Sequence, residues 1–381
     1  MATSFPEPDA YGRDISRQLS ERIRQVLVAS GGWISFERYM HYVLYDPALG
    51  YYHNGSKKFG AEGDFVTAPE LSVLFAEVLA TQIAGVLTQL DDPVILEIGA
   101  GTGRLAEDLS AVLRAQSVDT RYWVLEPSAE LRNRQQARFL ASGVEIQWLE
   151  QLPTEPLQGL ILANEVLDAF PTICFIKKGG KVRPLGVVWA DDGFAWAMGE
   201  PEQGLSDLVV ELETSLGYVF PEGFRSEISP TIPAWIQSIS STLKKGAVLT
   251  IDYGLTEREY YHPQRNQGTL LCHYRHRAHA DPFLLPGLQD IGAWVDFSAC
   301  ARAAKDAGLD VAGFTTQGQF LIHGGAAERL GRLDGDTAFR AAQALKTLVL
   351  PGEMGERFKL LLLSRGLQLD PLPGRDFRDR L

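Results

Sequence analysis

An apolar run passes into a glycine turn and then into a helical pattern in the stretch Val94-Ile-Leu-Glu97-Ile-Gly99-Ala-Gly101-Thr-Gly103-Arg-Leu105. The apolar run predicts a buried strand over 94–98. A helix follows through Leu105 and Leu109, and the next strand is expected over 122–125. Strand, turn, helix and strand in this order form a βαβ unit, which predicts a parallel sheet.

The same alternation continues along the chain. A helix is expected near 128–141, with further strands over 144–148, 160–163, 247–251, 311–315 and 320–323. The last two are expected to form a closing antiparallel pair. The sequence therefore predicts an α/β fold with a doubly wound, Rossmann-like core.

Other segments interrupt or flank this core. Gly179-Gly180 and Asp191-Asp192-Gly193 separate apolar runs as in an antiparallel meander. The expected parts are an N-terminal helical and loop cap (1–90), the core (91–170 and 226–323), an inserted β subdomain (171–225), an active-site loop insertion within the core (255–295) and C-terminal helices (324–381).

Composition narrows the classes of function. The chain has 381 residues, is 45% apolar and carries a formal net charge of -12, which argues against nucleic acid as the main partner. It contains no apolar run of the roughly 20 residues that a spanning helix needs. Its N-terminus has no signal or transit character, so a cytoplasmic location is expected. Cys174, Cys272 and Cys300 are expected to be packing residues.

The glycine spacing indicates a nucleoside-binding turn. Gly99, Gly101 and Gly103 follow G-x-G-x-G and not the G-x-G-x-x-G of dinucleotide binding. Bare backbone allows a ligand to approach closely. This favours S-adenosyl-L-methionine over a nicotinamide cofactor, and a methyltransferase over a dehydrogenase.

Two acidic residues support that cofactor. Glu97 places negative charge where the amino group and the sulfonium would lie, an environment poorly suited to a pyrophosphate. Glu126 ends the second strand, where a carboxylate can accept hydrogen bonds from the ribose hydroxyls. The alternative is that both are polar strand ends beside a tight turn.

A third acidic cluster, Asn164-Glu165-Val-Leu-Asp168-Ala-Phe-Pro171, follows the strand over 160–163. There Asn164 is assigned to the cofactor, while Glu165 and Asp168 are the catalytic candidates and would share one face if a helix starts here. The alternative is helix capping by Asn164 with acids in the first turn. Asp252 is a further candidate, although turn formation explains it equally well.

His273, His276 and His279 recur every three residues and raise the question of a metal site. Arg275 and Arg277 lie between them and would disfavour a nearby cation. No metal is therefore expected, and the segment is predicted to be a mobile loop over the substrate.

On these motifs the chain resembles the MidA-like methyltransferases. The resemblance covers Tyr45-Asp-Pro47 with Gly50-Tyr-Tyr52, Gly63-Asp-Phe-Val-Thr67-Ala-Pro-Glu70, the glycine turn, the cluster over 164–171, and Asp296-Phe-Ser298. The family includes the mitochondrial arginine methyltransferase needed for assembly of respiratory complex I. The resemblance implies a class I methyltransferase core with an N-terminal cap, and Thr67 and Glu70 closing over the cofactor.

The resemblance also implies a protein arginine as acceptor. A guanidinium is always protonated, so paired carboxylates such as Glu165 and Asp168 would hold and orient it. Other acceptors, including small molecules and other protein side chains, stay open, as does an assembly factor that binds the cofactor without turnover. The sequence leaves the oligomeric state undetermined.

Overall fold

The structure is a computed structural model that describes residues 5–55 and 66–381. Its contacts divide the chain into two compact units. Unit 1 comprises Met1–Phe65, Ala169–Thr231 and Glu257–Trp294, and unit 2 comprises Val66–Asp168, Ile232–Thr256 and Val295–Leu381. The expected cap boundary at residue 90 differs from this division, because the helices over 68–87 pack within unit 2.

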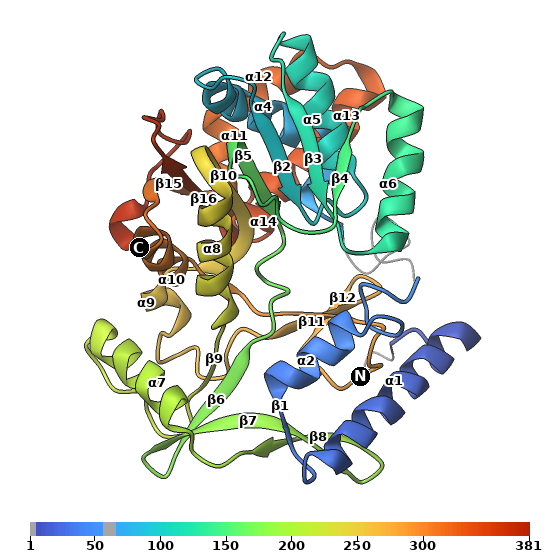
Figure 1. The fold of residues 1–381 in the computed structure, drawn as a ribbon, viewed down its shortest axis with the longest axis vertical. Coiled ribbons are helices and arrows are strands. Elements are labelled where there is room, and N and C mark those ends of the chain that lie inside the picture. Colours follow the sequence, from blue (N-terminus) through green and yellow to red (C-terminus); the bar gives the residue numbers. More distant parts are fainter. Residues whose placement is uncertain (1–4, 56–65) are drawn as a thin grey trace. The chain divides into compact units, whose positions relative to one another are not determined.

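Unit 2 contains an eight-stranded sheet (Figure 1). Its order is β15-β16-β10-β5-β2-β3-β4, and β14 pairs with β10. The strands are β2 (Val94–Ile98), β3 (Arg121–Leu125), β4 (Gln147–Leu149), β5 (Leu157–Asn164), β10 (Leu243–Leu255), β14 (Val295–Asp296), β15 (Asp310–Thr316) and β16 (Phe358–Arg365). The strands from β10 to β4 are parallel, whereas β16 is antiparallel to both of its neighbours. The predicted α/β class is confirmed.

Helices of unit 2 supply the rest of its core. They are α3 (Ala68–Leu71), α4 (Val73–Leu87), α5 (Arg104–Ala115), α6 (Ala129–Ser142), α8 (Thr231–Thr242), α10 (Phe297–Asp306), α11 (Gln317–His323), α12 (Ala326–Leu330), α13 (Gly335–Val349), α14 (Met354–Arg357) and the short η1 (Arg378–Arg380). In α5, Leu105, Leu109 and Leu113 recur at four-residue steps and are buried. This stripe holds the helix that follows the glycine turn.

The strand order creates a switch point beside β2. From β2 the chain proceeds to β3 and β4 on one side, and then returns to form β5 on the other side. In open α/β sheets, ligands bind beyond the carboxyl ends of the strands at such a point. The carboxyl ends of β2, β3 and β5 are thus where a site is expected.

Unit 1 contains two smaller antiparallel sheets. One has the order β1-β7-β6-β9 with β8 paired to β7, and the other has the order β12-β11-β13. The elements are α1 (Ala10–Ala29), β1 (Ile34–Ser35), α2 (Phe36–Tyr45), β6 (Ile173–Lys178), β7 (Lys181–Ala190), β8 (Gly193–Met198), α7 (Gln203–Leu216), β9 (Arg225–Ile228), α9 (Glu257–Tyr260), β11 (Leu271–Tyr274), β12 (Arg277–His279) and β13 (Asp290–Gly292).

Two expected elements near the C-terminus are wrong. Residues 320–323 form the end of helix α11, not a strand, because Thr316 caps the helix and Phe320 and Leu321 face the core. The partner of β15 is instead β16, which lies inside the stretch expected to be only helices. A short apolar run such as 320–323 does not by itself distinguish strand from helix.

The His/Arg-rich segment also differs from its expectation as a loop. It is a hairpin in which β11 pairs with β12, and Arg275 and His276 turn it with φ values of 46° and 60°. Two successive positive φ values suit the twist of a tight hairpin. Helix α7, between β8 and β9, was missed because the glycine-separated strands dominated the pattern there.

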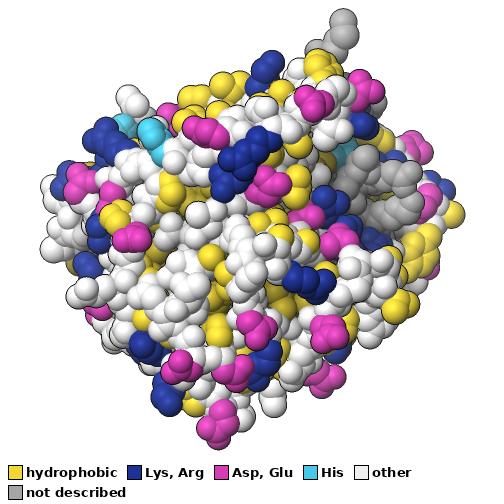
Figure 2. Space-filling view, turned by 90° about the horizontal axis from the view of Figure 1, so that it is seen from above, with side chains coloured by type: hydrophobic (Ala, Val, Ile, Leu, Met, Phe, Trp, Pro, Cys, Tyr) yellow, Lys and Arg dark blue, Asp and Glu magenta, His cyan; other side chains and the backbone are white. Residues whose placement is uncertain are grey.

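Surface and burial agree with an ordinary folded protein. No helix of the described residues is both long and apolar enough to cross a membrane. All three cysteines are buried. Figure 2 shows acidic and basic side chains interspersed on one face of the described residues.

Candidate functional site

The glycine turn lies between β2 and α5 in unit 2. All three of its glycines have left-handed backbone, with φ values of 66° at Gly99, 55° at Gly101 and 79° at Gly103. The space around these glycines differs. A Cβ at Gly103 would lie 2.7 Å from Cζ of Phe139, so packing against α6 demands this glycine. A Cβ at Gly99 would lie 3.3 Å from Cγ2 of Val166, which places the turn beside the acidic cluster.

Glu97 is buried just before this turn, with 2% of its surface exposed. Tyr122 Oη donates a hydrogen bond of 2.7 Å to its carboxylate. Burial, opposed by this hydrogen bond and reinforced by the charge of Glu126, raises the pKa of Glu97 to about 7. A nearby cation would favour the charged form of this carboxyl group.

Glu126 directly follows β3 and is also buried. Its carboxylate accepts hydrogen bonds from the backbone N–H of Ser128 (3.0 Å) and from Gln135 Nε2 (3.4 Å). Burial raises the pKa of Glu126 to about 7 despite these donors. Gln135 Nε2 also donates to the carbonyl of Gly101 (2.9 Å), so one amide joins the acid to the glycine turn.

These residues fit S-adenosyl-L-methionine. In the register of the sheet, Ile98 lies opposite Leu125 and Ala163, so the residues that follow each strand meet at one edge. That edge presents two buried carboxylates with raised pKa values beside a glycine turn. In addition, the buried Oδ1 of Asn164 has no hydrogen-bond partner within residues 5–55 and 66–381. A cationic ligand with ribose hydroxyls would supply positive charge beside the two carboxylates and donors for acceptors such as this one.

Glu70 reaches the same turn from α3. Its carboxylate accepts a hydrogen bond from the hydroxyl of Thr102, which stands between two of the glycines. Thr67 precedes α3 and makes no side-chain capping bond there. Gly63, Asp64 and Phe65 of the same motif lie outside the described residues. The structure thus brings Glu70 to the turn and gives Thr67 no link to it among the described residues.

The acidic cluster follows β5 as a loop, so the helix that would place Glu165 and Asp168 on one face does not form. Glu165 has a φ of 54°, and its backbone N–H donates to the carbonyl of Ile251 (2.8 Å). A non-glycine residue in left-handed backbone is strained, and such strain is concentrated at functional sites. Asn164 Nδ2 donates to Glu165 Oε1 (3.1 Å) and therefore holds the side chain instead of capping a helix.

Asp252 holds this loop in place. One of its oxygens accepts from the backbone N–H groups of Val166 (3.1 Å), Leu167 (2.9 Å) and Asp168 (3.3 Å). The carboxylate is 1% exposed and comes from β10. The buried carboxylate of Asp252 therefore fixes the backbone of the acidic loop.

Asp168 is held from the same strand. Tyr253 Oη donates a 2.6 Å hydrogen bond to its Oδ2. Burial first, and then the charges of Asp168 and Glu165, raise the pKa of Asp252 well above its usual range. Three carboxyl groups thus share one electrostatic environment, which an incoming guanidinium would stabilise.

We expect Asp252→Ala to destabilise unit 2 and to lower activity. The substitution leaves three backbone N–H groups without their acceptor, at a cost of about 1–3 kcal/mol for each buried group. Thermal unfolding together with kcat and KM measures the effect, and Asp252→Asn is expected to restore part of both because its amide oxygen still accepts. The matched control is Asp9→Ala in unit 1, which removes a carboxylate that accepts from Gly12 N. If Asp252→Ala lowered stability without changing kcat, Asp252 would have no positioning role.

Glu97 should make the stability of the cofactor-free protein depend on pH. Its pKa of about 7 in the folded state exceeds the ordinary value of 4.5, so protonation favours folding. This contribution is complete below about pH 4.5 and is lost as the pH rises through 7. Glu97→Gln should therefore unfold at a higher temperature than the wild type at pH 8 and bind S-adenosylhomocysteine more weakly. If the difference in melting temperature between Glu97→Gln and the wild type did not grow from pH 5 to pH 8, the raised pKa of Glu97 would be contradicted.

Sequence reasoning missed three side chains that orient the site: Tyr122, Gln135 and Tyr253. Tyr122 could have been found, because it lies on the strand next to Glu97. Gln135 could also have been found, because it lies four residues from both Leu131 and Phe139, on the stripe of α6 that is buried. Tyr253 gave no signal, since its contact with Asp168 spans 85 residues.

The histidines do not form a metal cluster in the described residues, where no group of three or more potential metal ligands is found. Burial, followed by the proximity of His279, lowers the pKa of His273. The expectation that no metal binds stays a prediction.

Known proteins resemble the chain over most of its length. A family model described as S-adenosyl-L-methionine-dependent methyltransferase matches residues 78–315. A crystal structure of a COG1565 superfamily member and likely methyl transferase from Burkholderia thailandensis, bound to S-adenosyl-homocysteine, is 39% identical, with a TM-score of 0.91 over 99% of this chain and 100% of that chain.

Curated relatives are more distant. "Protein arginine methyltransferase NDUFAF7 homolog, mitochondrial" of Drosophila melanogaster is 26% identical, and the alignment covers 97% of this chain and 90% of the relative. "Protein arginine methyltransferase NDUFAF7, mitochondrial" of Mus musculus is 28% identical, with coverage of 91% and 85%. The arginine specificity and the mitochondrial location belong to the names of those relatives.

Proposed function

Since the chain belongs to the family of S-adenosyl-L-methionine-dependent methyltransferases, we propose that it methylates an arginine side chain of a protein. The observation that carries this acceptor is the group of carboxylates at the ends of β5 and β10. Glu165 and Asp168 belong to one loop that a third acid, Asp252, holds in place. Such a group suits a cationic acceptor better than a neutral one.

The cofactor is assigned to the glycine turn. Gly99 and Gly101 allow close approach, Glu97 faces the cationic end, and Glu126 accepts from the ribose. Asn164 and Glu70 complete the surroundings, and Thr67 is assigned there by the family motif alone. When bound, S-adenosyl-L-methionine supplies a methyl group on a positively charged sulfur. A lysine acceptor is also cationic and would use the same carboxylates, whereas a glutamine amide or a neutral small molecule would leave them without a counter-charge.

The catalytic work of the chain is mainly positioning. Glu165 and Asp168 hold the guanidinium through charge-assisted hydrogen bonds and direct one nitrogen toward the cofactor. Tyr253 fixes the orientation of Asp168. The carboxylates also lower the electrostatic cost of bringing a protonated guanidinium close to a second positive charge.

The test is to incubate the purified protein with methyl-labelled cofactor and a lysate from cells that lack it. We expect label on a protein chain, and mass spectrometry should place the methyl groups on arginine. Label on lysine, glutamine or a small molecule would overturn the acceptor while leaving the methyltransferase class intact. The resemblance to the MidA-like methyltransferases suggests a respiratory complex subunit as a first protein to examine.

A further inference from the structure

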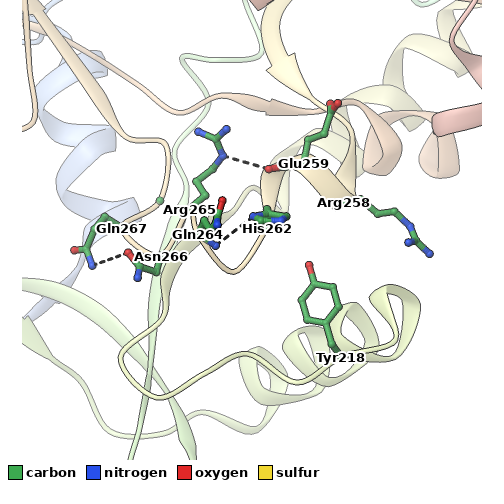
Figure 3. A pocket seen from close by; sticks show the side chains of 9 residues that line it. Tyr218, Arg258, Glu259, His262, Gln264, Arg265, Asn266 and Gln267 are labelled. Atoms are coloured by element: carbon green, nitrogen blue, oxygen red, sulfur yellow. Dashed lines mark hydrogen bonds between the residues drawn. The ribbon is translucent and has the colours of Figure 1, made fainter.

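A polar pocket in unit 1 lies outside the site described above. Its volume is about 770 Å³, and it is formed by Tyr218 and the segment over 258–268 (Figure 3). Its lining includes the side chains of Arg258, His262, Arg265, Asn266 and Gln267 and one acid, Glu259. A pocket of this size accommodates a short segment of a ligand and not only a single ion.

A buried acid holds the pocket segment in shape. Glu227 of β9 is 4% exposed and accepts hydrogen bonds from Thr269 N (2.9 Å) and Thr269 Oγ1 (3.2 Å). Gly268 passes so close that a Cβ there would lie 2.0 Å from Glu227 Oε1. Two residues before Gly268, the carbonyl of Asn266 accepts a hydrogen bond from Arg225 N (3.1 Å). The segment is therefore fixed at two points before any ligand arrives.

Two arginines line the pocket without a carboxylate partner among the described residues. Arg265 Nε donates to the carbonyl of Glu259 (3.2 Å), and its guanidinium lies over the ring of Trp294 at 5.5 Å. These contacts orient the guanidinium but leave its charge unneutralised. Arg258 forms no ion pair with any described residue. Figure 3 shows the Glu259 carboxylate directed away from Tyr218.

The other polar groups of the pocket are mostly donors. The Nδ1 atom of His262 accepts from Gln264 N (3.3 Å), so the neutral ring carries its proton on Nε2. Gln267 Nε2 donates to Asn266 Oδ1 (3.3 Å), which leaves the amide group of Asn266 as a donor. A lining of guanidinium, imidazole and amide donors matches a ligand that carries acceptors and negative charge.

We propose that this pocket binds an acidic segment of a protein, with carboxylates on Arg258 and Arg265. A guanidinium pairs with a carboxylate through two parallel hydrogen bonds. The net charge of -12 repels an extended polyanion such as nucleic acid more strongly than a short acidic segment. The inference rests on the proposed function in one respect, namely that the methyl acceptor which carries the segment is a protein.

The test measures binding of a fluorescein-labelled peptide of alternating Glu and Gly residues by anisotropy, without cofactor. We expect this peptide to bind the wild type, and the Gln counterpart not to bind. The double variant Arg258→Ala/Arg265→Ala should bind at least about tenfold more weakly. The control Arg332→Ala/Arg340→Ala removes the same charge from exposed positions of unit 2 and should leave the affinity unchanged.

Three results would overturn the proposal: equal binding of the Gln peptide, an equal loss in the control variant, or displacement of the peptide by inorganic phosphate or a single-stranded oligonucleotide at lower concentration than by unlabelled peptide. Melting temperatures of both double variants show that they fold. Because no methyl transfer is measured, failure of the proposed function would leave this result unaffected.

Discussion

Glu165→Gln is expected to lower the rate of methyl transfer by about 10²–10³-fold while the affinity for S-adenosylhomocysteine stays within about twofold of the wild type. The substitution preserves the size of the side chain and its hydrogen bond from Asn164 Nδ2, but removes the charge that would hold a guanidinium. Turnover with labelled cofactor and calorimetry of cofactor binding measure the two effects. Glu150→Gln, which neutralises an exposed carboxylate in unit 2, is the control.

A second substitution at the same position separates strain from charge. Glu165 has a φ of 54°, which glycine adopts without cost. Glu165→Gly should therefore unfold at a temperature no lower than that of the wild type, yet be as inactive as Glu165→Gln. Activity retained by either variant would remove Glu165 from the catalytic group.

Gly101→Val is expected to abolish cofactor binding without unfolding the chain. With a φ of 55°, any side chain at this position is strained by about 1–2 kcal/mol, and it would occupy the space that the cofactor needs. A cost of this size is smaller than the usual stability of a folded protein, about 5–15 kcal/mol. Calorimetry with S-adenosylhomocysteine measures the loss.

Gly143→Val provides the matched control for this change. Gly143 ends α6 with a φ of 66°, and a Cβ there would meet nothing within 4 Å. The two variants should lose similar amounts of stability, whereas only Gly101→Val should lose the cofactor. Equal loss of binding in both would mean that backbone strain, and not contact with the ligand, is responsible.

The cofactor edge could be predicted because it follows from periodicity and sheet geometry. A strand, a glycine turn and a helix fix the first βα unit, and the carboxyl ends of neighbouring parallel strands meet at one edge. The local pattern was therefore enough to predict that Glu97 and Glu126 lie at the same edge of the sheet. Their roles in binding stay predictions, although the family and its cofactor are confirmed.

The acidic loop could not be predicted in its details. Its residues are typical of the start of a helix, but Glu165 has a φ of 54° and its backbone N–H donates to the carbonyl of Ile251. The next three N–H groups are bound by Asp252, more than 80 residues away in the sequence. Whether Asp252 lies within hydrogen-bond distance of these N–H groups depends on the register of β5 against β10. The pattern of a single segment does not contain that register.

A second difference between the expected and the observed elements has a similar origin. Residues 320–323 were expected to be the closing strand, yet β16, with seven of its eight residues buried, occupies that place in the sheet. Local apolar pattern indicates that a segment is buried, but long-range pairing decides whether it becomes strand or helix. The parts of the chain that depend on local pattern alone were the parts predicted.

The most direct test of the account is a crystal structure of this protein with S-adenosylhomocysteine. We predict that the nucleoside lies against the backbone of Gly99 to Gly103, with its ribose hydroxyls on Glu126 and its amino group on the side of Glu97. Density for the ligand at any other place, or a ribose that does not contact Glu126, would contradict the account.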